Sequence, residues 1–275
     1  IYPERAIVTD PISEKSIISK MMNKINKVVF KNVDKVVALS FEMKKYLLVH
    51  RPWLSESQIE VIPNWYEDNG LDDTKTALNN ILFDSITNKD NFIVSYFGNM
   101  GIAQDLNTIV EAIKKLKGDN NIKFLFAGHG NKMNTLKNIV FEEDLKNVTI
   151  FDFLHGQDFQ DALNISDCFL VSLAEGLTGL AVPSKTYSYM MAGKPVIAII
   201  GNESDIAKDL KENYAGYSME VGEIKKLVKA IYELKSNEYK CKQMGQNARN
   251  IFLNKYTKEN CTRQYIKMMK EILEA

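Results

Sequence analysis

The alternation of apolar segments and amphipathic helices after residue 91 constrains the fold more than any other feature of this chain. Strands are expected at 92–97, 123–127, 148–152, 168–173 and 196–200, with helices between them. Short strands that are apolar on both faces and alternate with helices are typical of a parallel sheet that is covered by helices on both sides. The expected fold class is therefore α/β, with a Rossmann-like, doubly wound parallel sheet.

The first 66 residues show too few strands for a complete domain of this kind. Helices are expected at 17–30 and 41–50, and strands at 35–40 and 60–62. We interpret residues 1–66 as the C-terminal remnant of another Rossmann-like domain, which gives a partial second α/β domain. The chain begins with Ile1 rather than Met, and we expect it to be a fragment that lacks its upstream part. We interpret residues 67–91 as a linker that leads into the larger domain. Residues 92–255 are expected to form that domain, a ligand-binding Rossmann-like domain, and residues 256–275 a C-terminal helix.

Composition excludes several classes of protein. The 275 residues carry 35 Lys and Arg against 35 Asp and Glu, so no global basic field favours a nucleic-acid partner. The cysteines, Cys168, Cys241 and Cys261, are far apart and form no C-x-x-C motif, which fits a reduced cytosolic environment. No cluster has metal-ligand spacing, and no apolar run approaches the ~18 residues of a membrane span.

Three glycine-containing loops follow predicted strands. They lie at 98–101, 128–130 and 174–183. Ligands of open parallel sheets bind outside the carboxyl ends of the strands. We therefore expect these loops, although distant in sequence, to meet on one rim of the sheet.

The stretch 175–197 predicts a phosphate site within that rim. Ser184 is suited to cap a short helix, which Gly193 and Pro195 would end. The unpaired N–H groups and the positive dipole of a helix N-terminus favour an anion. Lys185 falls in the first helical turn, where the dipole disfavours a cation, and a bound anion would explain its presence. The alternative is a structural cap beside a solvated lysine.

Several motifs resemble those of family 4 glycosyltransferases, which have the GT-B fold. Residues 182–197, Val-Pro-Ser-Lys-Thr-Tyr-Ser-Tyr-Met-Met-Ala-Gly-Lys-Pro-Val-Ile, are similar to the donor-binding motif of that family. Four other stretches agree in order: 34–40, 61–65, 96–106 and 127–130. The resemblance is greatest to bacterial enzymes that build capsule, O-antigen or exopolysaccharide.

This resemblance implies transfer of a sugar from a nucleotide-diphosphate-sugar, with a UDP-sugar favoured, to an acceptor hydroxyl. It implies retention of anomeric configuration, no metal and no other cofactor. The donor would bind residues 92–255, residues 1–66 would belong to the acceptor-side domain, and the helix at 256–275 would cross back to that domain. The acceptor would be a saccharide or lipid-linked saccharide in the cytoplasm, with peripheral association at the inner membrane face left open. Oligomeric state is not predicted.

The resemblance also implies roles for individual residues. Lys185 and the amides near Ser184 would stabilise the diphosphate leaving group, and Glu175 would contact the donor sugar. Ser188 occupies the place of a glutamate that holds the ribose, and a hydroxyl binds ribose more weakly than a carboxylate. The other expected donor contacts are Gly98, Asn99, Met100, Gly101, Gly128, His129 and Gly179.

The chain departs from the family pattern in ways that leave alternatives open. Asn99 and Gln104 stand where many members have an arginine and a lysine that clamp phosphate. By counting, Leu180 rather than Glu175 matches the first family glutamate. For His129, an ordinary surface position is the alternative, and for Gly98 and Gly101, a plain strand-to-helix turn. The functional alternatives are a GT-B-fold nucleotide-sugar 2-epimerase and a non-catalytic nucleotide-binding or assembly module.

Overall fold

The computed structural model describes residues 1–9, 11–70 and 79–274, which form two parallel sheets. The larger sheet has six strands in the order β5-β4-β3-β6-β7-β8. Chain order moves outward from β3 in both directions, as in a doubly wound fold, so the predicted fold class is confirmed. The strand bounds are β3 Phe92–Asn99, β4 Ile122–His129, β5 Val148–Phe151, β6 Cys168–Ser172, β7 Val196–Ile199 and β8 Gly216–Met219.

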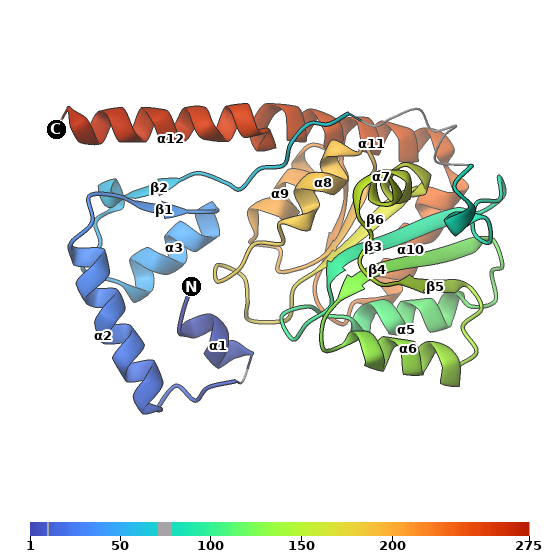
Figure 1. Cartoon of the computed structure of the whole chain (residues 1–275), viewed down its shortest axis with the longest axis horizontal. Coiled ribbons are helices and arrows are strands. Elements are labelled where there is room, and N and C mark those ends of the chain that lie inside the picture. The colour runs from blue at the N-terminus through green and yellow to red at the C-terminus, as the bar shows by residue number, and fades with distance from the viewer. Residues whose placement is uncertain (10, 71–78, 275) are drawn as a thin grey trace.

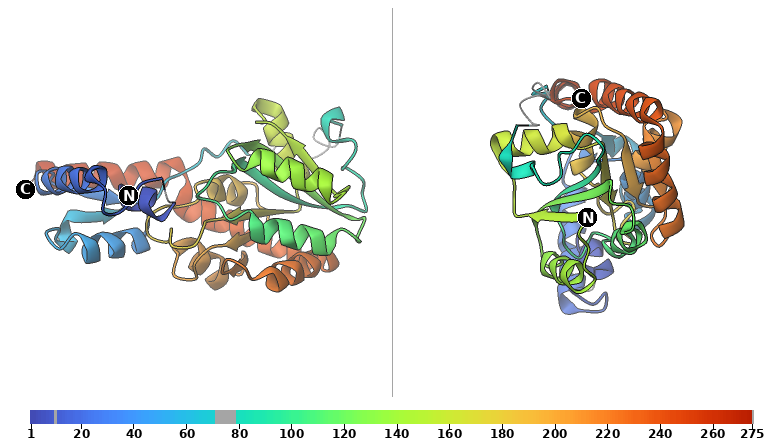
Figure 2. Two further views of the ribbon diagram at one scale, coloured as in Figure 1. Left: turned by 90° about the horizontal axis from the view of Figure 1, so that it is seen from below. Right: turned by 90° about the vertical axis from the view of Figure 1, so that its right-hand side faces the viewer.

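Helices cover both faces of this sheet, as Figure 2 shows. Side chains of β3 point alternately into two hydrophobic cores, one on each face of the sheet. Ile93 and Phe97 belong to the first core, and Val94 and Tyr96 belong to the second. This double burial explains the uninterrupted apolar runs in the sequence. Helices α7 Gly156–Ile165, α8 Lys185–Met191 and α9 Asp205–Glu212 contribute to the first core, and α5 Asn107–Leu116, α6 Met133–Glu142 and α10 Ile224–Ser236 to the second.

A second, two-stranded sheet lies within residues 1–9 and 11–66, which we call the N-terminal unit. Its parallel strands β1 (Val36–Ala38) and β2 (Ile59–Val61) pair with each other. Met43 and Leu47, in the helix at Phe41–His50, pack beneath these strands in a small core with Ala38 and Ile59. The other elements are α1 Glu4–Val8, α2 Ile17–Lys31, α3 Phe41–His50 and the 3₁₀ turn η1 Glu56–Gln58. Figure 1 shows this unit beside the six-stranded sheet.

The end of the chain returns to the N-terminal unit. Helix α11 (Glu238–Ile251) continues into the π-helical turn η3 (Phe252–Tyr256), and α12 (Lys258–Leu273) follows. The side chain of Thr257 caps α12 by accepting from the Asn260 N–H at 3.2 Å. Cys261 and Met268 of α12 are buried with Ile62, and Figure 1 shows α12 running along the N-terminal unit.

The region that the sequence suggested as linker contributes to the core. Residues 71–78 lie outside the described residues, but the turn η2 (Ile81–Phe83) follows them. Phe83 and Ile86 are buried in the first core of the six-stranded sheet. Within the described residues, no helix is long and apolar enough to cross a membrane.

Candidate functional site

Strands β3 and β4 stay in register to their carboxyl ends, where Gly98 pairs with Gly128 and Asn99 with His129. A Cβ atom on Gly128 would lie 1.9 Å from the Gly98 carbonyl oxygen. Gly130 is equally constrained, because its Cβ would lie 2.5 Å from the carbonyl oxygen of Met100. Both glycines have positive φ, so the close approach of the two loops depends on them.

Lys185 covers the end of β3 from the first turn of α8. Its Nζ lies 3.7 Å from the centroid of the Tyr96 ring and donates to the Asn99 carbonyl oxygen at 3.3 Å. Its Cε would be 3.6 Å from a Cβ on Gly98. No acidic partner of Lys185 is present in the described parts of the chain. Burial therefore lowers the pKa of the Lys185 ammonium to about 7.

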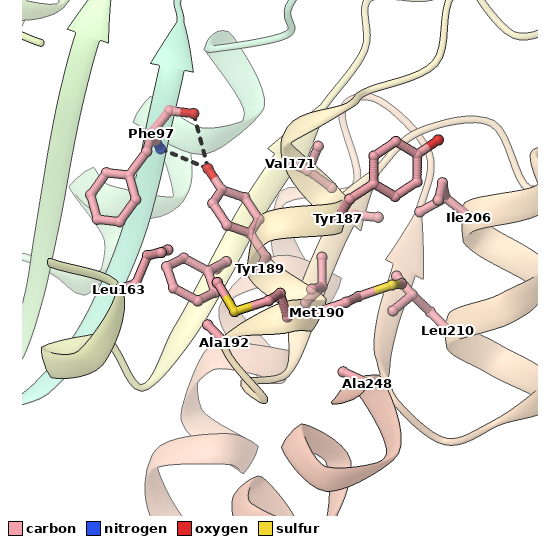
Figure 3. Packing of buried hydrophobic residues seen from close by; sticks show 14 of the residues in the cluster. Phe97, Leu163, Val171, Tyr187, Tyr189, Met190, Ala192, Ile206, Leu210 and Ala248 are labelled. Atoms are coloured by element: carbon pink, nitrogen blue, oxygen red, sulfur yellow. Dashed lines mark hydrogen bonds between the residues drawn. The ribbon is translucent and has the colours of Figure 1, made fainter. Parts of the chain in front are cut away.

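Tyr189, one helical turn after Lys185, fixes the same end of β3. The Phe97 N–H donates to the Tyr189 hydroxyl oxygen at 2.7 Å, and that hydroxyl donates to the Phe97 carbonyl oxygen at 3.0 Å (Figure 3). Strand β6 pairs with β3 only at Val94 and Ser95, so Tyr189 satisfies backbone groups beyond the point where the pairing ends. The ring also stacks on Phe169 with centroids 4.2 Å apart.

A pocket of about 140 Å³ opens between α8 and the ends of β3, β4 and β5. It is lined by Phe97, Gly98, Ala127, Phe153, Leu154, Phe159, Lys185, Ser188 and Tyr189. Beside it, the half-exposed Phe153 ring lies 5.6 Å from the ring of His129 and 4.6 Å from that of His155, centroid to centroid. The pocket is smaller than the ~300–1,000 Å³ usual for complete ligands, and suits one part of a larger molecule.

The structure brings the three predicted loops together on one rim. The first two meet at Gly98 and Gly128, and Lys185 reaches the first loop at Asn99. The third loop begins beside the segment that follows the first loop, where the Ala174 N–H donates to the Ala103 carbonyl oxygen at 2.9 Å.

The predicted residues of the third loop and of α8 occupy different settings. Ser184 precedes α8 as expected, but its side chain caps no backbone N–H and is exposed. Ser188 lines the pocket, with its hydroxyl donating to the Lys185 carbonyl oxygen at 2.8 Å. Glu175 is exposed on the loop. Gly179 faces α3, because its Cβ would lie 3.1 Å from the Glu42 carbonyl oxygen.

The predicted residues of the first two loops also differ in exposure. Asn99 and His129 are exposed at the strand ends, whereas Met100 is fully buried. The Gly101 N–H donates to the side-chain oxygen of Gln104 at 3.0 Å, which closes this turn.

Two further residues of this rim were not singled out from the sequence as site residues. Lys132 donates through Nζ to the Gln104 carbonyl oxygen at 2.7 Å and through its backbone N–H to the Met100 carbonyl oxygen at 2.9 Å. Lys132 thus brings a second cation close to the first loop. Its position two residues after Gly130 was the feature of the sequence that could have identified it. Phe153 is the second residue that the sequence analysis did not identify. Its position just after a predicted strand was the feature that could have identified it.

No group of three or more His, Cys, Asp or Glu side chains is arranged to hold a metal ion among the residues that the structure describes. The charged group that approaches the pocket is Lys185, and peptide N–H groups lie at the neighbouring N-terminus of α8. A lysine, helix amides and glycine turns are suited to binding an anion such as phosphate.

Two bacterial proteins are similar to this chain in sequence. The chain is 24% identical over 235 residues to the probable glycosyltransferase WbjE of Pseudomonas aeruginosa, covering 85% of this chain and 58% of WbjE. It is 28% identical over 166 residues to WcaI of Escherichia coli K12, a putative colanic acid biosynthesis glycosyl transferase, covering 59% of this chain and 39% of WcaI. The chain thus spans less than two thirds of these relatives.

Solved structures share the fold. Sucrose-phosphate synthase from Thermosynechococcus elongatus matches with a TM-score of 0.77 and 18% identity, over 98% of this chain and 66% of the other. HepE from Anabaena, solved in complex with UDP-glucose, matches with a TM-score of 0.74 and 15% identity, and the match covers 93% of this chain and 70% of HepE. A profile of the family described as glycosyl transferases group 1 matches residues 79–251, most of this chain. The chain belongs to the glycosyl transferases group 1 family.

Proposed function

We propose that this chain is the donor-binding part of a glycosyltransferase that acts in the synthesis of a bacterial surface polysaccharide. The longer protein would move a sugar from a nucleotide-diphosphate-sugar to a saccharide acceptor with retention of configuration. The placement of Lys185 over Gly98, at the N-terminus of α8, is the observation that carries the proposal. The bacterial polysaccharide context is supported by the similarity to WbjE and WcaI.

In this proposal the diphosphate lies over Gly98 and against Lys185. As the bond between the sugar's anomeric carbon and the phosphate oxygen breaks, negative charge grows on the leaving diphosphate. The Lys185 ammonium and the amides of Ser184 and Lys185 would stabilise that charge, whereas the next amide, that of Thr186, already donates to the Pro183 carbonyl oxygen. Glycine at position 98 leaves the space that a phosphate oxygen needs, because a side chain there would meet Lys185.

The nucleoside would extend toward β5. The Phe153 ring, which lies near the rings of His129 and His155, offers an aromatic surface on which a base can stack, and Ser188 also lines this pocket. HepE, which shares this fold, was solved with UDP-glucose, and this favours a uridine nucleotide here. We place the donor in residues 92–255 and the acceptor on the side of the N-terminal unit, where Gly179 of the third loop meets α3. A lipid-linked acceptor would place the protein in the cytoplasm at the inner face of a membrane.

Isothermal titration of the 275-residue chain with UDP, and separately with GDP, tests the proposal. We expect UDP to bind, and Lys185→Met to weaken that binding at least tenfold because it removes the cation that faces the diphosphate. Lys146→Met is the matched control, since Lys146 is exposed and contacts Asp144 instead. Absence of heat with both nucleotides, or equal affinity of the Lys185 variant and the unchanged chain, would contradict the proposal.

One observation favours a second candidate, a nucleotide-binding module without transferase activity. The Ser188 hydroxyl, where the family pattern has a carboxylate, donates to the Lys185 carbonyl oxygen. Incubation of the longer protein with donor and acceptor separates the two, because such a module would bind UDP and release no nucleotide.

A further inference from the structure

The Lys185 side chain crosses the carboxyl end of β3. Its helix α8 packs on the first core of the six-stranded sheet, whereas the ring that its ammonium meets, that of Tyr96, belongs to the second core. Tyr96 and Gly98 face the same side of β3, because side chains alternate along a strand. A Cβ at position 98 would lie 3.6 Å from the Lys185 Cε, so the lysine runs directly against the strand at this point.

Two uncharged groups hold the ammonium there. Lys185 Nζ lies 3.7 Å from the centroid of the Tyr96 ring and donates to the Asn99 carbonyl oxygen at 3.3 Å. Across residues 1–9, 11–70 and 79–274, no carboxylate pairs with Lys185. The negative face of the aromatic ring and the carbonyl oxygen therefore offset the solvation that the ammonium loses.

Tyr96 is fixed at both ends of its side chain. It is fully buried in the second core, where its ring centroid lies 5.9 Å from that of Phe126. At the other end, its hydroxyl donates to the same Asn99 carbonyl oxygen as Lys185, at 3.2 Å. A ring that cannot move gives one preferred position to the ammonium of an otherwise flexible lysine.

We propose that Tyr96 is a positioning residue of the diphosphate site, whose ring holds the Lys185 ammonium over the end of β3 without neutralising it. An ammonium has three N–H donors. One is used by Asn99 and a second faces the ring, so the third is left for a diphosphate oxygen. A carboxylate in place of the ring would also hold the lysine, but it would compete with the diphosphate for the charge. The inference rests on the proposed function, because it assumes that a diphosphate binds beside Lys185.

A double-mutant cycle tests the inference, with UDP affinity of the 275-residue chain measured by titration calorimetry. Tyr96→Leu should weaken UDP binding about fivefold, because the ligand must then immobilise a lysine that the ring no longer holds. In a Lys185→Met background the same change should alter the affinity by less than about twofold, because no ammonium remains to be held. Tyr96→Phe keeps the ring and should bind UDP nearly as the unchanged chain does. Tyr96→Met fills more of the space and should act as Tyr96→Leu does, which keeps the test decisive if the leucine variant does not fold.

Phe126→Leu is the matched control, since it removes a buried ring from the same core and leaves the ring beneath Lys185 in place. It should bind UDP as the unchanged chain does. Unchanged affinity in Tyr96→Leu and Tyr96→Met, or equal weakening with and without Lys185, would overturn the inference and leave the proposed function standing. Equal weakening in Phe126→Leu would also overturn it, because the effect would then be one of general packing. Unchanged affinity in Lys185→Met alone would overturn both.

Discussion

At the scale of single residues, the charge of Lys185 is the property that matters most for the proposed site. Burial without an acidic partner lowers the pKa of its ammonium to about 7, so the free protein loses this positive charge near neutral pH. A diphosphate beside Nζ would favour the protonated form and raise that pKa again.

We therefore expect UDP binding to take up a proton between pH 7 and 8, and its affinity to fall as pH rises above about 7. Titration calorimetry in two buffers with different ionisation enthalpies measures the uptake. Lys185→Arg should keep its charge and flatten the pH dependence, and the control Lys146→Met should behave as the unchanged chain. A pH-independent affinity in the unchanged chain would contradict the assignment of Lys185 to the diphosphate.

Residues also show where sequence reasoning reached its limit. Gly98, Gly128 and Lys185 could be predicted to converge, because strand ends of a parallel sheet share one edge. Lys132 and Phe153 were missed, since the role of each depends on a neighbour from another loop, Gln104 or His129. The sequence also did not predict that the Ser184 side chain makes no capping hydrogen bond. Serine is a common cap residue, but the backbone of Ser184 is helical here, and its backbone angles cannot be read from the residue type.

At the scale of elements, α8 both carries the candidate lysine and holds the end of β3. Replacement of Tyr189 by Phe should lower the free energy of unfolding by about 1–3 kcal/mol, because it leaves the buried Phe97 N–H without a partner. Urea denaturation measures this loss. Tyr187→Phe on the same helix is the control, since its hydroxyl makes no hydrogen bond within the described residues. Equal stability of the two variants would show that the Tyr189 hydroxyl does not secure β3.

The elements that the sequence predicted best are those with apolar character on both faces. Strands β3, β4, β6 and β7 are nearly uniformly apolar and buried, and their positions could be predicted from that pattern alone. Strand β8, Gly216–Met219, was missed because it lies at the edge of the sheet and contains Gly and Ser, which weaken a strand signal. Phe83 in η2 escaped notice because one buried aromatic residue in a polar segment has no periodicity.

At the scale of the whole molecule, hydrogen bonds join the N-terminal ends of α3 and α9, and in each bond a carboxylate of one helix accepts from a backbone N–H of the other. The Asp205 carboxylate accepts from the Phe41 N–H at 2.7 Å, and the Glu42 carboxylate accepts from the Asp205 N–H at 3.1 Å. Each helix N-terminus is thus capped by an acid of the other unit. Burial, with the nearby charge of Asp205 as a second cause, raises the pKa of Glu42 to about 7.

A carboxyl whose pKa is higher in the folded state contributes stability that is present below its unfolded pKa and is lost as pH rises through the folded value. The contribution of Glu42 should therefore decline between pH 4.5 and about 7 and stay constant above. Glu42→Gln keeps an oxygen that can accept from the Asp205 N–H and removes the repulsion, so its melting temperature should exceed that of the unchanged chain at pH 8. The difference between the two chains, measured across this range by thermal melting, should shrink toward pH 4.5. A constant difference would show that Glu42 does not titrate there.

The polypeptide passes between the two units at two adjacent places. The two crossing segments contact each other: the Tyr66 N–H donates to the Tyr256 carbonyl oxygen at 3.1 Å, and Tyr66 forms a parallel bridge with Thr257. A rotation of the N-terminal unit would therefore have to bend both segments together. The hydrogen bonds between α3 and α9 join the same two units at another place, so the N-terminal unit is held against the rest of the molecule at more than one point.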